Sequence, residues 1–127
     1  MTSMKEKLLN SSVEIEGVKF DLKNGAGSSD DYSVLMEEDS IYIGEINQGD
    51  VEGSISLVAF NSGGSGTFYY LVVHRFESGE FRQLLSTSVE TNYEEREFRV
   101  LDDKSILVEI RYREGYQTRF IIKISNF

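Results

Sequence analysis

Oxygen-bearing side chains recur between Gly44 and Gly53, where the sequence reads GEINQGDVEG. Calcium-binding loops of the D-x-N-x-D-G type place such oxygens at alternate positions, with a glycine where the chain turns sharply. Glu45 and Asn47 match the first and third positions of such a loop, and Asp50 stands where the glycine is expected. A hard divalent ion takes about six to eight oxygen ligands, so backbone carbonyls and water would have to supply most of them. An acidic turn between two strands is therefore the favoured interpretation, and calcium binding at Glu45, Asn47 and Asp50 is the alternative.

Other candidate chemistry is weaker. His74 is the only histidine, and no neighbouring residue offers the orienting partner and nucleophile that a catalytic base needs. The run Gly63–Gly66 leads into a segment with the composition of a strand, not into the helix N-terminus that a phosphate cradle requires. Carboxylate pairs such as Glu94-Glu95 are expected in turns, where solvated charge explains them. The sequence thus predicts no catalytic residues, no enzymatic activity and no cofactor, calcium apart.

The elements that would position these residues follow from side-chain periodicity. Ser3-Met4-Lys5-Glu6 has capping-box spacing, which predicts a short helix from about Met4 to Asn10. From Val13 onward a period of two is typical of half-buried strands. Strands are expected at Val13–Ile15, Val18–Leu22, Ser40–Ile46, Gly53–Phe60, Thr67–Phe76, Phe81–Glu90, Glu95–Leu101, Ile106–Tyr112 and Thr118–Ile124. Asn24–Asp31 is expected to be a flexible turn.

Two of these runs, Gly53–Phe60 and Thr67–Phe76, are nearly continuously apolar, which favours central strands covered on both faces. The sequence therefore predicts a mainly β fold. We expect a single antiparallel sheet system of about eight or nine strands (a meander, a sandwich or an open barrel) with one short N-terminal helix. Residues 1–12 would form the helical segment and residues 13–127 a single β domain.

Composition limits the classes of function. The 127 residues are 39% hydrophobic, enough for one core and against disorder. No cysteine is present, which excludes disulfides and thiolate metal sites. The formal charge of −9, from 22 acidic and 13 basic residues, repels nucleic acid and anionic membranes. It favours a basic protein partner, or serves solubility alone.

Exposed aromatic residues are the candidate contacts for such a partner. Neighbouring strand residues face opposite ways, so Tyr69 cannot share a face with Phe68 or Tyr70. At least one tyrosine of this run is therefore expected on the less buried side, where tyrosine is a favoured binding residue. Tyr93 is the second candidate. The acidic residues close to it in the sequence complete the predicted partner-binding set: Glu90, Glu94, Glu95 and Glu97.

Two motifs carry a resemblance to a known family. The chain reads Gly44-Glu45-Ile46-Asn47 before one apolar strand and Gly63-Gly64-Ser65-Gly66-Thr67-Phe68-Tyr69-Tyr70-Leu71 at the start of the next. From Val18 to about Glu90 it resembles an uncharacterised family of small bacterial β-rich domains, often exported or lipoprotein-like. Members read G-D-L-N-G-D-G and G-G-S-G-T-F-x-Y-L at these places, so the first motif is degraded here. The resemblance implies a β-rich, non-enzymatic domain and carries no activity with it.

Two functions remain open from the sequence. The first is a protein-interaction domain whose acidic surface binds a basic partner, in the manner of an immunity or inhibitor protein. The second is an accessory domain of a bacterial envelope protein with a weak or vestigial calcium loop. The first twelve residues hold no apolar run long enough for a signal peptide or a membrane span. The expected location is the cytoplasm, or the periplasm or envelope if a signal sequence has been removed.

Overall fold

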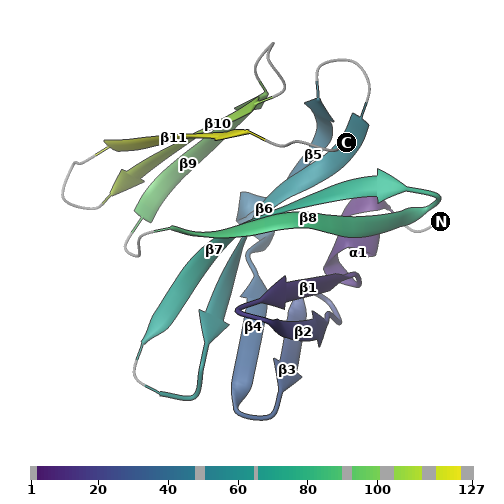
Figure 1. Cartoon of the computed structure of the whole chain (residues 1–127), viewed down its shortest axis with the longest axis vertical. Coiled ribbons are helices and arrows are strands. Elements are labelled where there is room, and N and C mark those ends of the chain that lie inside the picture. The colour runs from purple at the N-terminus through teal and green to yellow at the C-terminus, as the bar shows by residue number, and fades with distance from the viewer. Residues whose placement is uncertain are drawn as a thin grey trace.

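The computed structural model describes residues 3–47, 51–64, 66–89, 93–100, 105–112 and 117–123, the last three ranges by their backbone. It confirms the predicted mainly β, antiparallel fold with one short N-terminal helix (Figure 1). The elements are α1 (Met4–Leu9), β1 (Ser12–Ile15), β2 (Val18–Asp21), β3 (Ala26–Ser29), β4 (Tyr32–Met36), the 3-10 turn η1 (Glu38–Ser40), β5 (Tyr42–Asn47), β6 (Val51–Asn61), β7 (Thr67–Glu77), β8 (Glu80–Val89), β9 (Tyr93–Val100), β10 (Ser105–Tyr112) and β11 (Gln117–Lys123).

The strands form three antiparallel sheets. The main sheet has the order β3-β4-β6-β7-β8, and β5 pairs with the part of β6 that β4 leaves free. The hairpin β1-β2 and the sheet β11-β10-β9 are separate from it. Among the described residues the sheets do not close into a barrel. The only helix in the described chain is α1, and it is too short to cross a membrane.

The central strands β6 and β7 are buried on both faces, as their apolar sequences predict. One face, which we call the hairpin face, packs under α1 and the β1-β2 hairpin. Its core combines residues of the sheet with those of the N-terminal segment: Val34, Met36, Val58, Phe60, Val72 and Phe81 with Leu8, Leu9, Val13, Ile15, Phe20 and Leu22. Side chains of the opposite face are also buried: Ile46, Ile55, Leu57, Leu71 and Val73. The sheet β11-β10-β9 lies on the β5 side of the molecule, where β9 approaches β5 (Figure 1).

The hairpin is held by side chains of the sheet, not by backbone pairing. Glu16 and Gly17 have φ values of 54° and 78°, the left-handed geometry of a tight two-residue turn. The Gln83 amide accepts a hydrogen bond from Glu14 N and donates one to Glu14 O, both at 2.9 Å. His74 Nε2 lies 2.9 Å from Ser12 O. These contacts satisfy the edge of β1 that faces away from β2, and we call them, with that of Tyr70 below, the hairpin seam.

Tyr70 completes the hairpin seam at the turn. Its hydroxyl donates to the Glu16 carboxylate at 2.6 Å. Burial, and then this hydrogen bond, raise the pKa of Tyr70 to about 12. Tyr70 therefore stays protonated, and able to donate, across the physiological range of pH.

A β-bulge places Gln83 and His74 on the same face. Val73 pairs with Leu85 and His74 with Gln83, so Leu84 is one residue extra in β8. The bulge reverses the alternation of side chains along β8. Gln83 and Phe81 consequently face the hairpin, although strict alternation would have put Leu85 on their side.

One sequence prediction is wrong. Asn24–Asp31 was expected to be a flexible turn, but it contains strand β3, which pairs with an unpredicted strand, β4. The turn residues occupy only the two ends of this segment, where Asn24, Gly25 and Asp30 have positive φ. Because β3 is an edge strand with small and polar side chains, its pairing rests on the backbone and leaves no apolar periodicity to detect.

The packing at Gly53 gives a first prediction. A Cβ atom at Gly53 would lie 2.1 Å from His74 O and 2.7 Å from Ile46 Cδ1, closer than atoms can approach. The His74 oxygen belongs to the backbone, so the sheet itself would have to move. Gly53→Ala is expected to lower the free energy of unfolding by about 2 kcal/mol or more, measured by urea denaturation. Gly64→Ala is the control, because a Cβ there meets nothing within 4 Å; equal effects of the two variants would contradict the prediction.

The hairpin seam gives a second prediction. Gln83→Ala removes the partner of both the N–H and the C=O of Glu14. We expect a loss of about 1 to 2 kcal/mol of stability, seen in urea denaturation. Amide hydrogen exchange should also accelerate at Glu14, while exchange in β6 and β7 changes only as global stability does. Thr87→Ala, at an exposed position of the same strand, is the control; unchanged exchange at Glu14 in Gln83→Ala would refute the role of the seam.

Candidate interaction surface

The proposed calcium ligands lie on the β5-β6 hairpin. Glu45 and Asn47 belong to β5, and Asp50 lies outside the described residues. Glu45 stands directly opposite Glu52 of β6, and both side chains are exposed. Tyr42 donates its hydroxyl proton to Glu45 O at 3.0 Å, and burial, followed by the nearby Glu45 charge, raises the pKa of Tyr42. No group of three or more His, Asp or Glu side chains arranged to hold a metal occurs in the described part of the chain. Calcium binding stays a prediction.

The structure does not gather the predicted partner-binding residues into one described site. Tyr69 lies in β7 and is half-buried, opposite Ala59 of β6. Tyr93, Glu94, Glu95 and Glu97 lie in β9, and Glu90 lies outside the described residues. The expectation of a turn at Glu94-Glu95 is wrong, because β10 pairs with this segment and sets Arg111 opposite Glu95. The prediction that Tyr69 faces away from Phe68 and Tyr70 is confirmed by the register of β6 and β7.

His74 is a buried part of the hairpin seam. Its Nε2 donates to Ser12 O, and its Nδ1 has no hydrogen-bond partner among the described protein groups. Ser54 stands directly opposite it in β6, a neighbour that sequence spacing could not reveal. Both side chains are fully buried, and no hydrogen bond links them. A serine nucleophile must reach both its base and a substrate, so this pair offers no accessible catalytic site.

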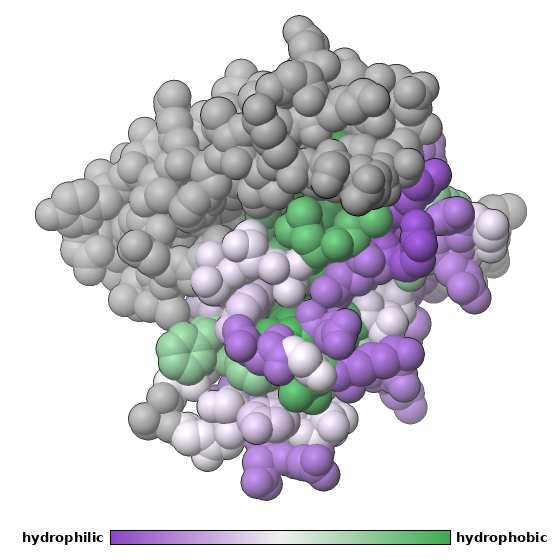
Figure 2. Space-filling model, in the orientation of Figure 1, coloured by the Kyte–Doolittle hydropathy of each residue, from purple (hydrophilic) through white to green (hydrophobic). Residues whose placement is uncertain are grey.

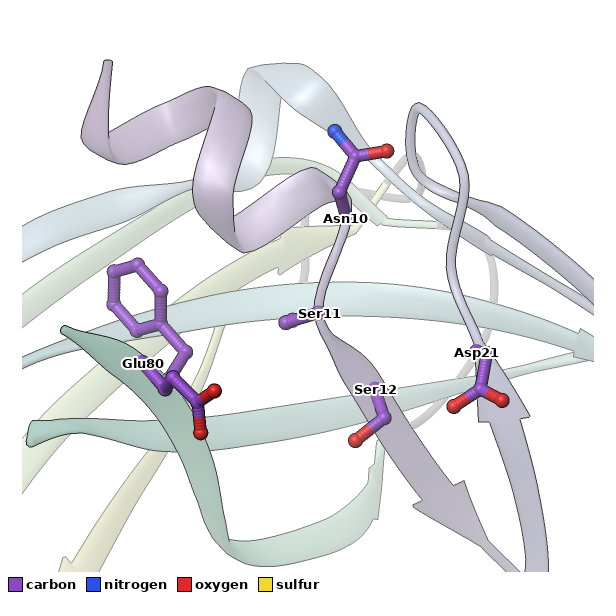
Figure 3. Close-up of a pocket in the computed structure, with 6 residues that line it drawn as sticks. Asn10, Ser11, Ser12, Asp21 and Glu80 are labelled. Carbon is purple, nitrogen blue, oxygen red and sulfur yellow. The ribbon is translucent and has the colours of Figure 1, made fainter. Parts of the chain in front are cut away.

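A shallow groove of about 350 Å³ lies beside the seam. Glu80 and Phe81 line it from β8, and Ser12 and Asp21 from the hairpin (Figure 3). Glu77 is close by but is engaged with Arg82 at 3.0 Å. The groove offers carboxylates and hydroxyls to solvent and little enclosure.

The negative charge is distributed very unevenly along the sequence. Between Asn24 and His74 there are eight acidic residues and no lysine or arginine, so this stretch contributes −8 of the formal −9. It comprises β3 to β6, η1 and most of β7. Lys5 of α1 reaches this stretch, with its Nζ 3.7 Å from Glu38 Oε2.

The fold sets these carboxylates along one border of the main sheet. β4 and β5 both pair with the same edge of β6, one with its C-terminal half and the other with its N-terminal half. The β3-β4 turn, η1 and the β5-β6 hairpin follow one another along this border. We call it the acidic margin; the acidic residues whose side chains are described here are Asp30, Asp31, Glu37, Glu38, Glu45 and Glu52. Hydrophilic side chains also cover α1, the β1-β2 hairpin and the β7-β8 turn (Figure 2), but there acidic and basic residues are mixed.

One end of the acidic margin carries exposed aromatic rings. Phe68 is 51% exposed and Tyr32 is 36% exposed. Both flank the buried Phe60 on the hairpin face: Phe68 stands opposite it in β7, and the Tyr32 ring stacks on it at 5.8 Å. We call Tyr32, Phe60 and Phe68 the aromatic rim. The motif that begins at Gly63 in the β6-β7 loop contains Phe68, so it supplies one ring of the aromatic rim.

Comparison with models of protein families, with curated proteins and with solved structures finds no match to this chain. The family resemblance drawn from the two motifs therefore stays a prediction.

The sequence predicts the net charge but not its location on the surface, and it favours Tyr69 over Phe68 as the exposed ring. The absence of lysine and arginine from residues 24–74 could have revealed the first. The exposure of Phe68 depends on where the hairpin stops covering its face of the sheet. That is a property of tertiary packing.

Burial of His74 gives a third prediction, about pH. Burial lowers the pKa of His74, and the hydrogen bond to Ser12 O opposes this only in part. Below the ordinary pKa of about 6.5, the unfolded chain takes up a proton that the folded chain resists. The stability contributed by neutral His74 is thus present above pH 6.5. It is lost as the pH falls toward the lowered value, by up to about 1.4 kcal/mol per pH unit.

The measurement is the free energy of unfolding by urea between pH 7 and pH 5. His74→Gln should have the shallower pH dependence over this range, even though it is less stable at pH 7. Identical slopes for the two proteins would show that His74 is not the group responsible.

Proposed function

We propose that this chain is a non-enzymatic, acidic protein-interaction domain that binds a basic partner, in the manner of an immunity or inhibitor protein. The observation that carries the proposal is the acidic margin. Eight acidic residues without one lysine or arginine lie between Asn24 and His74. A charge meant only for solubility would need no such segregation.

Segregated charge has a physical consequence for binding. Like charges along one border repel one another, and Glu45 opposite Glu52 is a direct case. A basic partner would relieve this repulsion on binding. Complementary fields also steer the two proteins together, which raises the association rate and makes it sensitive to salt. The same field disfavours nucleic acid and anionic lipid as ligands.

The surface is suited to a protein partner more than to a small substrate. The groove beside the seam is shallow and open, whereas substrate pockets enclose most of their ligand. At one end of the margin, exposed Phe68 and Tyr32 supply the aromatic contact area that is enriched at protein interfaces. The charges that would steer a partner toward the protein therefore lie next to the aromatic area that would hold it.

The test is capture of partners by the immobilised protein at about 50 mM and about 500 mM salt, followed by binding kinetics with the partner identified. The proposal expects a basic partner whose association rate falls on the order of tenfold at the higher salt. No partner at either salt would contradict it.

Two charge-matched variants locate the surface. One carries Glu37→Gln, Glu45→Gln and Glu52→Gln on the acidic margin. The control carries Glu6→Gln, Asp21→Asn and Glu80→Gln, outside the margin. Both lose three negative charges, so net charge alone cannot distinguish them. Slower association of the first variant only is the expected result, and an equal loss in both would show that the margin is not the binding surface.

A further inference from the structure

We propose that the aromatic rim, together with the β3-β4 turn, binds an arginine-bearing segment of the basic partner, with the guanidinium over Phe68 and paired with Asp30 or Asp31. This inference rests on the proposed function and assigns the contact point and its chemistry. It draws on the exposure of the rings, the built shape of the loops beside them, and the local charge.

The rings of the rim are available for contact. In the described part of the chain, the Phe68 ring has no ring or cation partner, although half of its surface is exposed. A ring of the same strand, Phe76, is already covered, because Lys7 Nζ lies 5.7 Å from its centroid. The hairpin face thus binds a cation over a phenylalanine at one end of β7 with its own lysine. It leaves the equivalent position open at the other end.

The loops beside the rim are held in a definite shape. Gly63 packs so closely on the β3-β4 turn that a Cβ atom would lie 2.9 Å from Asp31 O. Its φ of 84° also requires glycine. Asn61 Oδ1 accepts a hydrogen bond from Gly63 N at 2.8 Å, which fixes the start of the β6-β7 loop. Two exposed turns are therefore joined into one surface next to Phe68 and Tyr32, and preorganised surfaces lose less entropy on binding.

The charge beside the rim selects a cation. Asp30 and Asp31 are exposed and form no ion pair in the described part of the chain. Glu16 adds a third carboxylate near the same rings. It accepts a hydrogen bond from the Tyr70 hydroxyl, and the centroids of the Tyr70 and Phe60 rings are 5.9 Å apart. Of the two basic side chains, arginine fits better. Its planar guanidinium stacks on an aromatic face and donates to a carboxylate at the same time, whereas lysine is a compact, strongly hydrated charge.

The test compares two peptides of equal charge, Gly-Arg-Gly-Arg-Gly and Gly-Lys-Gly-Lys-Gly, titrated into the isotopically labelled protein at low salt. Ring signals of Phe68 and Tyr32 are followed by NMR. We expect the arginine peptide to shift these signals and to bind about two- to fivefold more tightly than the lysine peptide. Phe68→Ala should abolish that preference. Phe68→Leu, which keeps apolar area without a π face, should do the same and guards against misfolding of the first variant.

Two controls separate the possible outcomes. Leu35→Ala removes an equally exposed apolar side chain, 51%, from the other face of the sheet, and should leave both affinities unchanged. Asp30→Asn with Asp31→Asn should weaken both peptides. Equal affinity for the two peptides, or no effect of Phe68→Ala, overturns the inference. If the peptides bind but shift only signals at Glu37, Glu45 and Glu52, the rim is excluded and the proposed function stands. If neither peptide binds at low salt, both proposals fall.

Discussion

The fold depends on how the edge of β1 is satisfied. The main sheet must cover its hairpin face, and the only described elements that do so are α1 and the β1-β2 hairpin. A two-stranded hairpin is marginal alone, and its unpaired edge would leave polar backbone groups beside an apolar core. His74 meets this edge at the backbone of Ser12 and Gln83 at the backbone of Glu14, while Tyr70 donates to the Glu16 side chain in the turn beyond. Docking of the hairpin on the main sheet thus buries the apolar core and satisfies the polar edge of β1 at the same time.

That solution fixes much of the remaining sequence on the hairpin face. Gln83 must face the hairpin, so β8 needs its bulge at Leu84. His74 must lie on the covered face of β7 to reach Ser12, which accounts for a lone histidine inside an otherwise apolar strand. The hairpin covers Phe60, which Phe20 of β2 contacts, but it leaves the neighbouring Phe68 and Tyr32 exposed at the border of the core. The exposed aromatic rim is a consequence of where this cover stops.

The position of the acidic margin follows from the order of the strands in the main sheet. β4 and β5 pair with one edge of β6. The β3-β4 turn, η1 and the β5-β6 hairpin therefore all lie at the same border of the sheet. The chain fills these connections with Asp and Glu and omits Lys and Arg, while its N-terminal and C-terminal parts balance the two signs. The result is a nearly neutral body with one strongly negative border that ends in an aromatic patch. Under the proposed function, long-range attraction and then short-range contact would act on a single partner.

The sequence alone determined the strand-rich class, the capped helix and the two central strands, because each is recorded in local periodicity or turn chemistry. It also determined the total charge and the absence of cysteine chemistry. It could not show β3, whose pairing uses only the backbone. Nor could it show the bulge at Leu84, which has no characteristic residue type but reverses the facing of every side chain beyond it. It could not show that Ser54 faces His74, or that Phe68 and not Tyr69 is the exposed ring. Those features depend on which strands become neighbours and which face the hairpin covers, and contacts between residues far apart in the chain leave no local signature.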